Sequence, residues 1–63
     1  MSKYELTFSL ERAARKSGGD RYLCKSPEHG EFMVYVPQTI SREGGTEPSR
    51  YMVIEFRPDP NRL

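Results

Sequence analysis

The sequence has no tryptophan, a single cysteine and a single histidine among its 63 residues. One cysteine excludes a disulfide within the chain, and Cys24 with His29 offers too few ligands for a structural zinc site, which usually takes four. We therefore expect no metal and no other cofactor. A free cysteine without an apolar signal segment is typical of a reducing compartment, so the sequence predicts a cytoplasmic protein.

Long apolar runs and a strong excess of one charge are missing too. The longest apolar run, Phe32 to Val36, is far too short to cross a membrane, so no membrane association is expected. Ten basic and nine acidic residues give a net charge of +1, unlike the basic balance of most nucleic-acid binders. Both signs are mixed along the chain, so any basic patch must be created by folding.

Alternation of apolar and polar residues dominates what the sequence does contain. In residues 4–10, YELTFSL, every second side chain is apolar, as in a half-buried strand. Three further stretches have strand character: residues 21–25, 31–36 and 50–57. In 31–36 the core face holds Phe32, Val34 and Val36, and in 50–57 it holds Met52, Ile54 and Phe56.

Residues 11–22, ERAARKSGGDRY, allow two interpretations. In one, a short helix begins after Ser9 and ends at Gly18. In the other, the first strand continues, turns near the Gly-Gly pair and returns as residues 21–25. A helix of about eight residues is marginal on its own and here has little apolar surface to bury. Because Gly-Gly between two alternating runs is a hairpin signal, we favour the hairpin.

The expected fold is mainly β, a small antiparallel barrel or curled sheet of four to five strands with room for one short helical turn. Residues 1–57 form a single domain, and residues 58–63 form an extended tail. The long connection 38–49 is expected to be a loop that Ile40 tucks back onto the core. The order of strands and turns resembles small SH3-like or OB-like barrels in a general way, and such folds host many functions.

Enzymatic activity is not expected. Cys24 and His29 flank a proline turn without the third orienting group that a nucleophilic pair needs. The pairs Gly18-Gly19 and Gly44-Gly45 lack the spacing and the lysine-serine partner of a phosphate-binding loop. They are better explained as turns that need a positive φ.

Aromatic and basic side chains outside the core faces suggest a binding module. If strands 31–36 and 50–57 pair, Tyr35 and Tyr51 share one face of the sheet. Small β-folds bind single-stranded nucleic acid by stacking bases on such rings while basic side chains contact phosphates. The candidate binding residues for nucleic acid or another partner are Tyr22, Lys25, Tyr35, Arg50, Tyr51, Arg57, Arg15 and Lys16.

A second hypothesis is a protein-interaction or assembly element. Tyrosines in a small sheet also serve in a second core or a dimer contact, with the hydroxyl at the rim. The short length, the near-neutral charge and a third strand that is apolar on both faces favour a homodimer or a small regulatory subunit.

Overall fold

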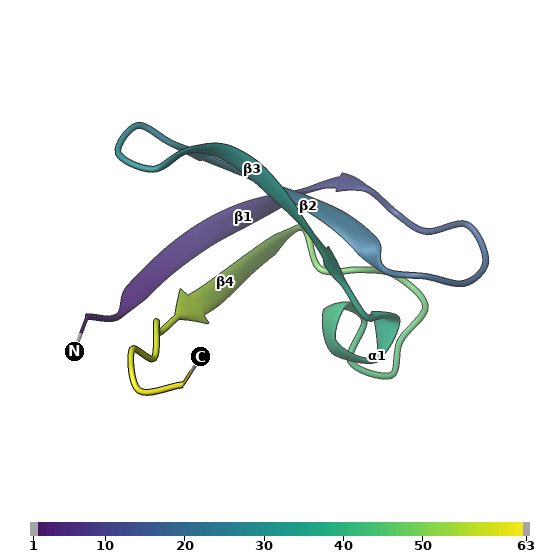
Figure 1. Ribbon diagram of the computed structural model, residues 1–63. Coiled ribbons are helices and arrows are strands. Elements are labelled where there is room, and N and C mark those ends of the chain that lie inside the picture. Colours follow the sequence, from purple (N-terminus) through teal and green to yellow (C-terminus); the bar gives the residue numbers. More distant parts are fainter. Residues whose placement is uncertain (1, 63) are drawn as a thin grey trace.

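The computed structural model describes residues 2–62 and contains one antiparallel sheet and one helical turn (Figure 1). The elements along the chain are β1 (Tyr4–Arg12), β2 (Asp20–Ser26), β3 (Gly30–Val36), α1 (Gln38–Ser41) and β4 (Tyr51–Phe56). The mainly β fold predicted from the sequence is confirmed. All four predicted strands are present, with bounds that differ by no more than a few residues.

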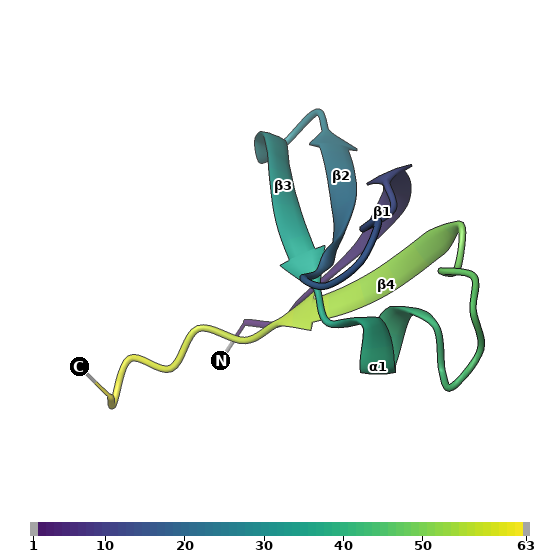
Figure 2. The ribbon, with the colours of Figure 1, turned by 90° about the vertical axis from the view of Figure 1, so that its right-hand side faces the viewer.

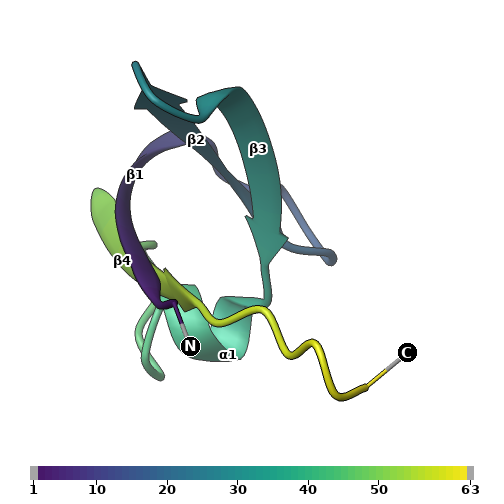
Figure 3. The ribbon, with the colours of Figure 1, turned by 60° about the vertical axis from the view of Figure 1, so that its left-hand side comes forward.

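The order of strands across the sheet is β3-β2-β1-β4, so β3 and β4 form its two edges. The sheet curls strongly, and α1 lies near β4 and the end of β3 (Figures 2 and 3). Within residues 2–62 the edges do not pair with each other, so the sheet stays open and the curled-sheet alternative holds over the closed barrel. Strands 31–36 and 50–57, which the sequence allowed to pair, are β3 and β4, and they do not pair with each other.

The hairpin interpretation of residues 11–22 is confirmed. β1 runs on to Arg12, the chain turns, and β2 begins at Asp20 and pairs antiparallel with β1. Gly18 has a φ of +96°, a conformation that glycine adopts without strain. A Cβ added at Gly19 would lie 3.0 Å from the carbonyl oxygen of Val36, so the returning chain packs tightly against β3.

The core lies on the concave face of the sheet, where alternate side chains of all four strands meet. Its buried members are Phe8, Tyr22, Cys24 and Val36. Aromatic rings pack around Phe8, with the centroid of Phe32 at 5.4 Å and that of Phe56 at 6.2 Å. The core faces predicted for strands 4–10, 31–36 and 50–57 are those observed, because each follows the two-residue period of a strand.

The connection between β3 and β4 differs from its prediction. It begins with a helical turn, in which the carbonyl of Pro37 accepts hydrogen bonds from the amides of Ile40 at 2.9 Å and Ser41 at 3.0 Å. This turn directs Ser41 inward and leaves Ile40 58% exposed. The expectation that Ile40 tucks the loop onto the core was therefore wrong: a buried polar contact of Ser41 holds the segment instead.

After β4 the chain leaves the sheet (Figure 2). Residues 57–62 contain no strand or helix, and a local turn joins the amide of Asn61 to the Asp59 carboxylate at 3.0 Å. Leu63, the last residue of the predicted tail, lies outside the described residues. None of the helical structure in residues 2–62 is long and apolar enough to span a membrane.

Candidate functional site

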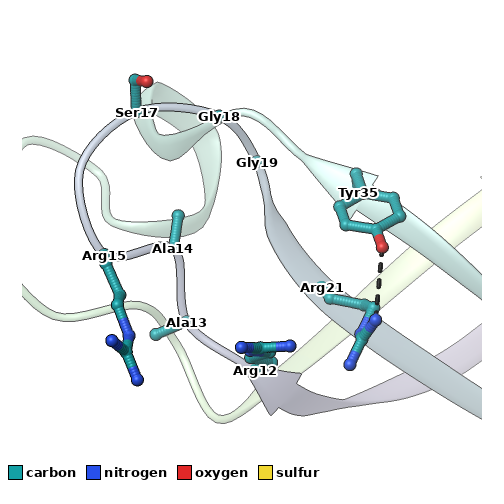
Figure 4. Close-up of a pocket in the computed structure, with 9 residues that line it drawn as sticks. All are labelled: Arg12, Ala13, Ala14, Arg15, Ser17, Gly18, Gly19, Arg21 and Tyr35. Atoms are coloured by element: carbon teal, nitrogen blue, oxygen red, sulfur yellow. Dashed lines mark hydrogen bonds between the residues drawn. The ribbon is translucent and has the colours of Figure 1, made fainter.

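A pocket of about 370 Å³ lies at the end of the β1–β2 hairpin. Its walls come from the end of β1, the connecting loop 13–19, the start of β2 and the far part of β3. Figure 4 shows three guanidinium groups on one side of the loop, with the ring of Tyr35 beyond the last of them. The polar and turn residues that line the pocket include Arg12, Arg15, Gly18, Gly19, Arg21 and Tyr35.

A β-bulge near the end of β1 brings two of these arginines together. Leu10 is opposite Tyr22 and Arg12 is opposite Arg21, so two steps along β1 match one step along β2. Strict alternation would place Arg12 on the concave face with Leu10. The extra residue turns Arg12 to the outer face that Arg21 occupies, because directly opposed residues of a strand pair share a face.

Arg21 links the arginines to the aromatic ring. Its Nη1 donates a hydrogen bond of 3.3 Å to the hydroxyl of Tyr35, the residue opposite it on β3. Its Nε lies 2.5 Å from Glu11 Oε1 without the direction of a hydrogen bond, so these two groups form an ion contact. The bond to Tyr35 and the nearby Glu11 carboxylate raise the pKa of Arg21 above its ordinary value. Tyr35 keeps 66% of its surface exposed.

Hydrogen bonds from distant residues hold the backbone of loop 13–19. The amide of Ala14 donates to Asp20 Oδ1 at 2.8 Å, and the carbonyl of Ala14 accepts from Arg42 Nη2 at 3.1 Å. The side-chain amide of Gln38, in α1, donates to the carbonyls of Lys16 at 3.2 Å and Gly18 at 2.9 Å. The backbone is therefore held by hydrogen bonds both before Arg15, at Ala14, and after it, at Lys16 and Gly18.

Asp20 is the centre of this network and is fully buried. It accepts hydrogen bonds from Arg42 Nη2 at 2.8 Å, Arg42 Nε at 3.1 Å and the hydroxyl of Ser41. The Arg42 guanidinium, with help from Ser41 and the Ala14 amide, holds the pKa of the Asp20 carboxyl well below its usual range despite its burial. A two-pronged arginine–carboxylate pair of this kind fixes geometry as well as charge.

Two of the predicted binding residues, Tyr35 and Arg15, line this pocket. Lys16 is on the other side of the loop, in an adjoining depression that also contacts Tyr35 and Gln38. Tyr22 differs from its expected place: its ring is fully buried and its hydroxyl donates to the carbonyl of Ser49 at 2.6 Å. Burial raises the pKa of Tyr22 above its ordinary value. Its ring is part of the core and offers no surface for stacking.

The other predicted residues are spread over the outer face of the sheet. Tyr51, on the β4 edge, is 69% exposed and lies opposite Ser9, which lies opposite Leu23 and then Met33 on β3. This register defines a transverse row across the outer face. Tyr35 is two residues beyond Met33, so Tyr35 and Tyr51 share the outer face but stand at opposite edges.

The remaining basic residues lie away from the pocket. Lys25 is opposite Glu31 on β3, and Arg57 forms an ion pair of 3.0 Å with Glu55. Arg50 precedes β4, where its carbonyl accepts a hydrogen bond from the amide of Leu10 at 2.8 Å. These three cations do not converge on one site.

Sequence reasoning did not select Arg12 and Arg21 as binding residues. The bulge that turns Arg12 to the outer face has no recognisable pattern in the sequence. Arg21 belongs to the site because it pairs with Tyr35 on β3, and this pairing is not evident from the sequence. Within residues 2–62, no group of three histidine, cysteine or acidic side chains is placed to hold a metal ion. Comparison with protein-family models, with curated proteins and with solved structures finds no match to this chain.

Proposed function

We propose that this protein is a non-enzymatic binding module for single-stranded nucleic acid, which it holds at the hairpin end of its outer sheet face. The observation that carries the proposal is the exposed ring of Tyr35 beside a pocket lined by Arg12, Arg15 and Arg21. An aromatic ring that stacks on a base contributes ~1–3 kcal/mol, and neighbouring cations contact the phosphates. Tyr35 and these arginines combine both parts in one place.

The outer face offers a path beyond the pocket. Met33, Leu23 and Tyr51 continue from Tyr35 toward the β4 edge, and the four strands together span roughly 14 Å at the usual strand spacing. Tyr51 thus provides a second stacking surface within reach of the same strand. Since the bases would stack on rings and not bond through their edges, we expect little dependence on base sequence.

Fluorescence anisotropy with labelled DNA and RNA strands of about 16 nucleotides tests the proposal. At low salt the wild-type chain is expected to bind saturably, and affinity should fall as salt rises because bound phosphates release counterions. Tyr35→Ala should weaken binding roughly tenfold, the equivalent of one lost stacking contact. Tyr35→Phe, which keeps the ring, should bind nearly as well as wild type.

Arg62→Gln is the matched control for charge. Arg62 is in the segment after β4 and pairs with Asp59, far along the chain from the pocket. Arg62→Gln removes the same formal charge as the pocket variant Arg15→Gln. A general effect of charge on affinity would therefore weaken the binding of both variants equally. Absence of saturable binding at low salt would exclude the proposed function, because phosphate contacts are strongest there.

The open sheet favours one second candidate, assembly through a second copy of the chain. The edges β3 and β4 flank a groove of about 410 Å³ whose lining is mostly apolar, with polar side-chain groups from Tyr35 and Glu55. Val34, Met52 and Ile54 in this groove are only half-buried. Strand addition at such an edge would cover them. Light scattering over a concentration range tests this: a mass that stays monomeric at high concentration excludes assembly.

A further inference from the structure

We infer that the arginine pocket receives the terminal phosphate of a strand, a phosphomonoester, and not an internal phosphodiester. This inference rests on the proposed function, because it assigns the part of the nucleic acid that the pocket would hold. Three observations carry it: the charge of the pocket, the fixed loop that forms one of its walls, and the position of Tyr35 at its open side.

The charge of the pocket matches a dianion. Arg12 and Arg15 form no ion pair within residues 2–62, whereas Arg21 is partly neutralised by Glu11. About two positive charges are therefore left without a counterion. A phosphomonoester carries roughly −1.5 to −2 charges at pH 7. An internal phosphodiester carries only one, so it would leave part of the pocket charge unmatched.

Loop 13–19 forms one wall of the pocket. Gln38 and Arg42 hold the carbonyls of Lys16, Gly18 and Ala14 in place from the far side. The loop also packs against β3 so closely that a single Cβ at Gly19 would lie 3.0–3.1 Å from backbone atoms of β3. No gap between the loop and β3 admits a continuous strand. The loop therefore walls the pocket off on the side toward β3, and a strand that enters past Tyr35 meets this wall.

The arginine side chains suit this ligand. Each guanidinium offers donors in a planar fork that matches the oxygens of a phosphate. Figure 4 shows the groups of Arg15, Arg12 and Arg21 in a row that leads to Tyr35. The last nucleotide can thus place its phosphate on the arginines while its base lies against the ring.

Three labelled strands of identical sequence test the inference by anisotropy: one with a 5′-phosphate, one with a 3′-phosphate and one with hydroxyls at both ends. One of the phosphorylated strands is expected to bind about tenfold more tightly than the hydroxyl strand, as for one charge-assisted contact. The preferred strand identifies which end enters. Inorganic phosphate should lower the affinity of the preferred phosphorylated strand to that of the hydroxyl strand. It should leave the affinity of the hydroxyl strand unchanged.

Variants link the effect to the pocket. The double variant Arg12→Gln with Arg15→Gln should lose the preference, and Arg57→Gln with Arg62→Gln, which removes the same charge elsewhere, should keep it. Tyr35→Ala should weaken all three strands while keeping their ratio. Gln38→Ala, which frees the loop without removing charge, should reduce the preference. Circular dichroism melts verify that each variant is folded.

The pH profile adds an independent readout. Arginine stays charged throughout, but a phosphomonoester takes up a proton near pH 6. The preference should therefore shrink between pH 7.5 and pH 5. Equal affinity for the three strands, or a preference that survives the loss of Arg12 and Arg15, overturns the inference and leaves the proposed function standing. No binding of any strand overturns both.

Discussion

Asp20 and Arg42 are 22 positions apart in the chain, yet Nη2 of Arg42 lies 2.8 Å from Oδ1 of Asp20. The same Nη2 donates to the carbonyl of Ala14, and Nη1 donates to the carbonyl of Thr46 at 3.0 Å. One guanidinium thus joins the start of β2, loop 13–19 and the connection that follows α1. In a chain with so small a core, this polar network stabilises the fold in the way that apolar burial would in a larger domain.

Asp20→Asn should destabilise the fold strongly. The substitution removes the charge that Arg42 faces while the position remains buried, and breaking a buried ion pair in this way costs about 3 kcal/mol at the lower end of its range. Because domains of this size are only marginally stable, a large unfolded population is expected. Urea unfolding followed by circular dichroism measures it. Asp59→Asn, at an exposed pair in the segment after β4, is the control and should change the midpoint little.

Stability should fall at acid pH through Asp20. Its folded pKa lies below its ordinary value of 3.8, so its contribution is fully present above about pH 4 and is lost as the pH falls toward the folded pKa. Urea midpoints between pH 6 and pH 2.5 should show this decline. Ser41→Ala removes one hydrogen bond that lowers the pKa and should flatten the slope. An identical slope in Ser41→Ala would contradict the prediction.

Substitutions at Tyr22 and Tyr35 should have opposite effects on stability and binding. Loss of the Tyr22 hydroxyl should lower stability alone, and loss of the Tyr35 ring should lower affinity alone. Tyr22→Phe leaves the carbonyl of Ser49 without its partner at 2.6 Å and should cost about 1 kcal/mol of unfolding free energy. Its affinity for single strands should stay unchanged, since the ring is buried. Tyr35→Ala should weaken binding while leaving the urea midpoint close to wild type. A Tyr22→Phe variant that binds more weakly but unfolds normally would reverse this assignment.

The thiol of Cys24 should be protected in the folded chain. Only 4% of the residue is exposed, so a thiol reagent such as dithiobisnitrobenzoate can reach it only through transient opening. Native protein should react slowly, and the same protein in urea should react at once. Cys24→Ala should bind single strands as wild type does. Rapid labelling of the native chain would show that this part of the core opens readily.

Much of the fold could be read from local pattern. Phe8, Met52 and Phe56 face inward because alternation along a strand is a property of the backbone and needs no knowledge of the partner strands. The hairpin over residues 11–22 followed from the Gly-Gly pair and the weak apolar face of the alternative helix. The short β2 was harder, because five residues with Tyr22, Leu23 and Cys24 in succession do not indicate which face is buried.

The site depended on contacts that no local pattern encodes. A bulge near the end of β1 moved Arg12 to the face of Arg21, and the pairing of β2 with β3 set Arg21 against Tyr35. The helical turn α1 directs Ser41 inward, where its hydroxyl donates a hydrogen bond to the buried Asp20, and this leaves Ile40 exposed.

The sequence by itself therefore determined the strands, the buried faces of β1, β3 and β4, and the hairpin, since these follow from a two-residue period and from turn chemistry. Only the tertiary structure decided which strands pair, that the sheet stays open, that Tyr22 is core and Tyr35 is surface, and that Arg12, Arg15 and Arg21 line one pocket. Those outcomes depend on long-range pairings such as that of Asp20 with Arg42, whose energy exists only once distant parts of the chain have met.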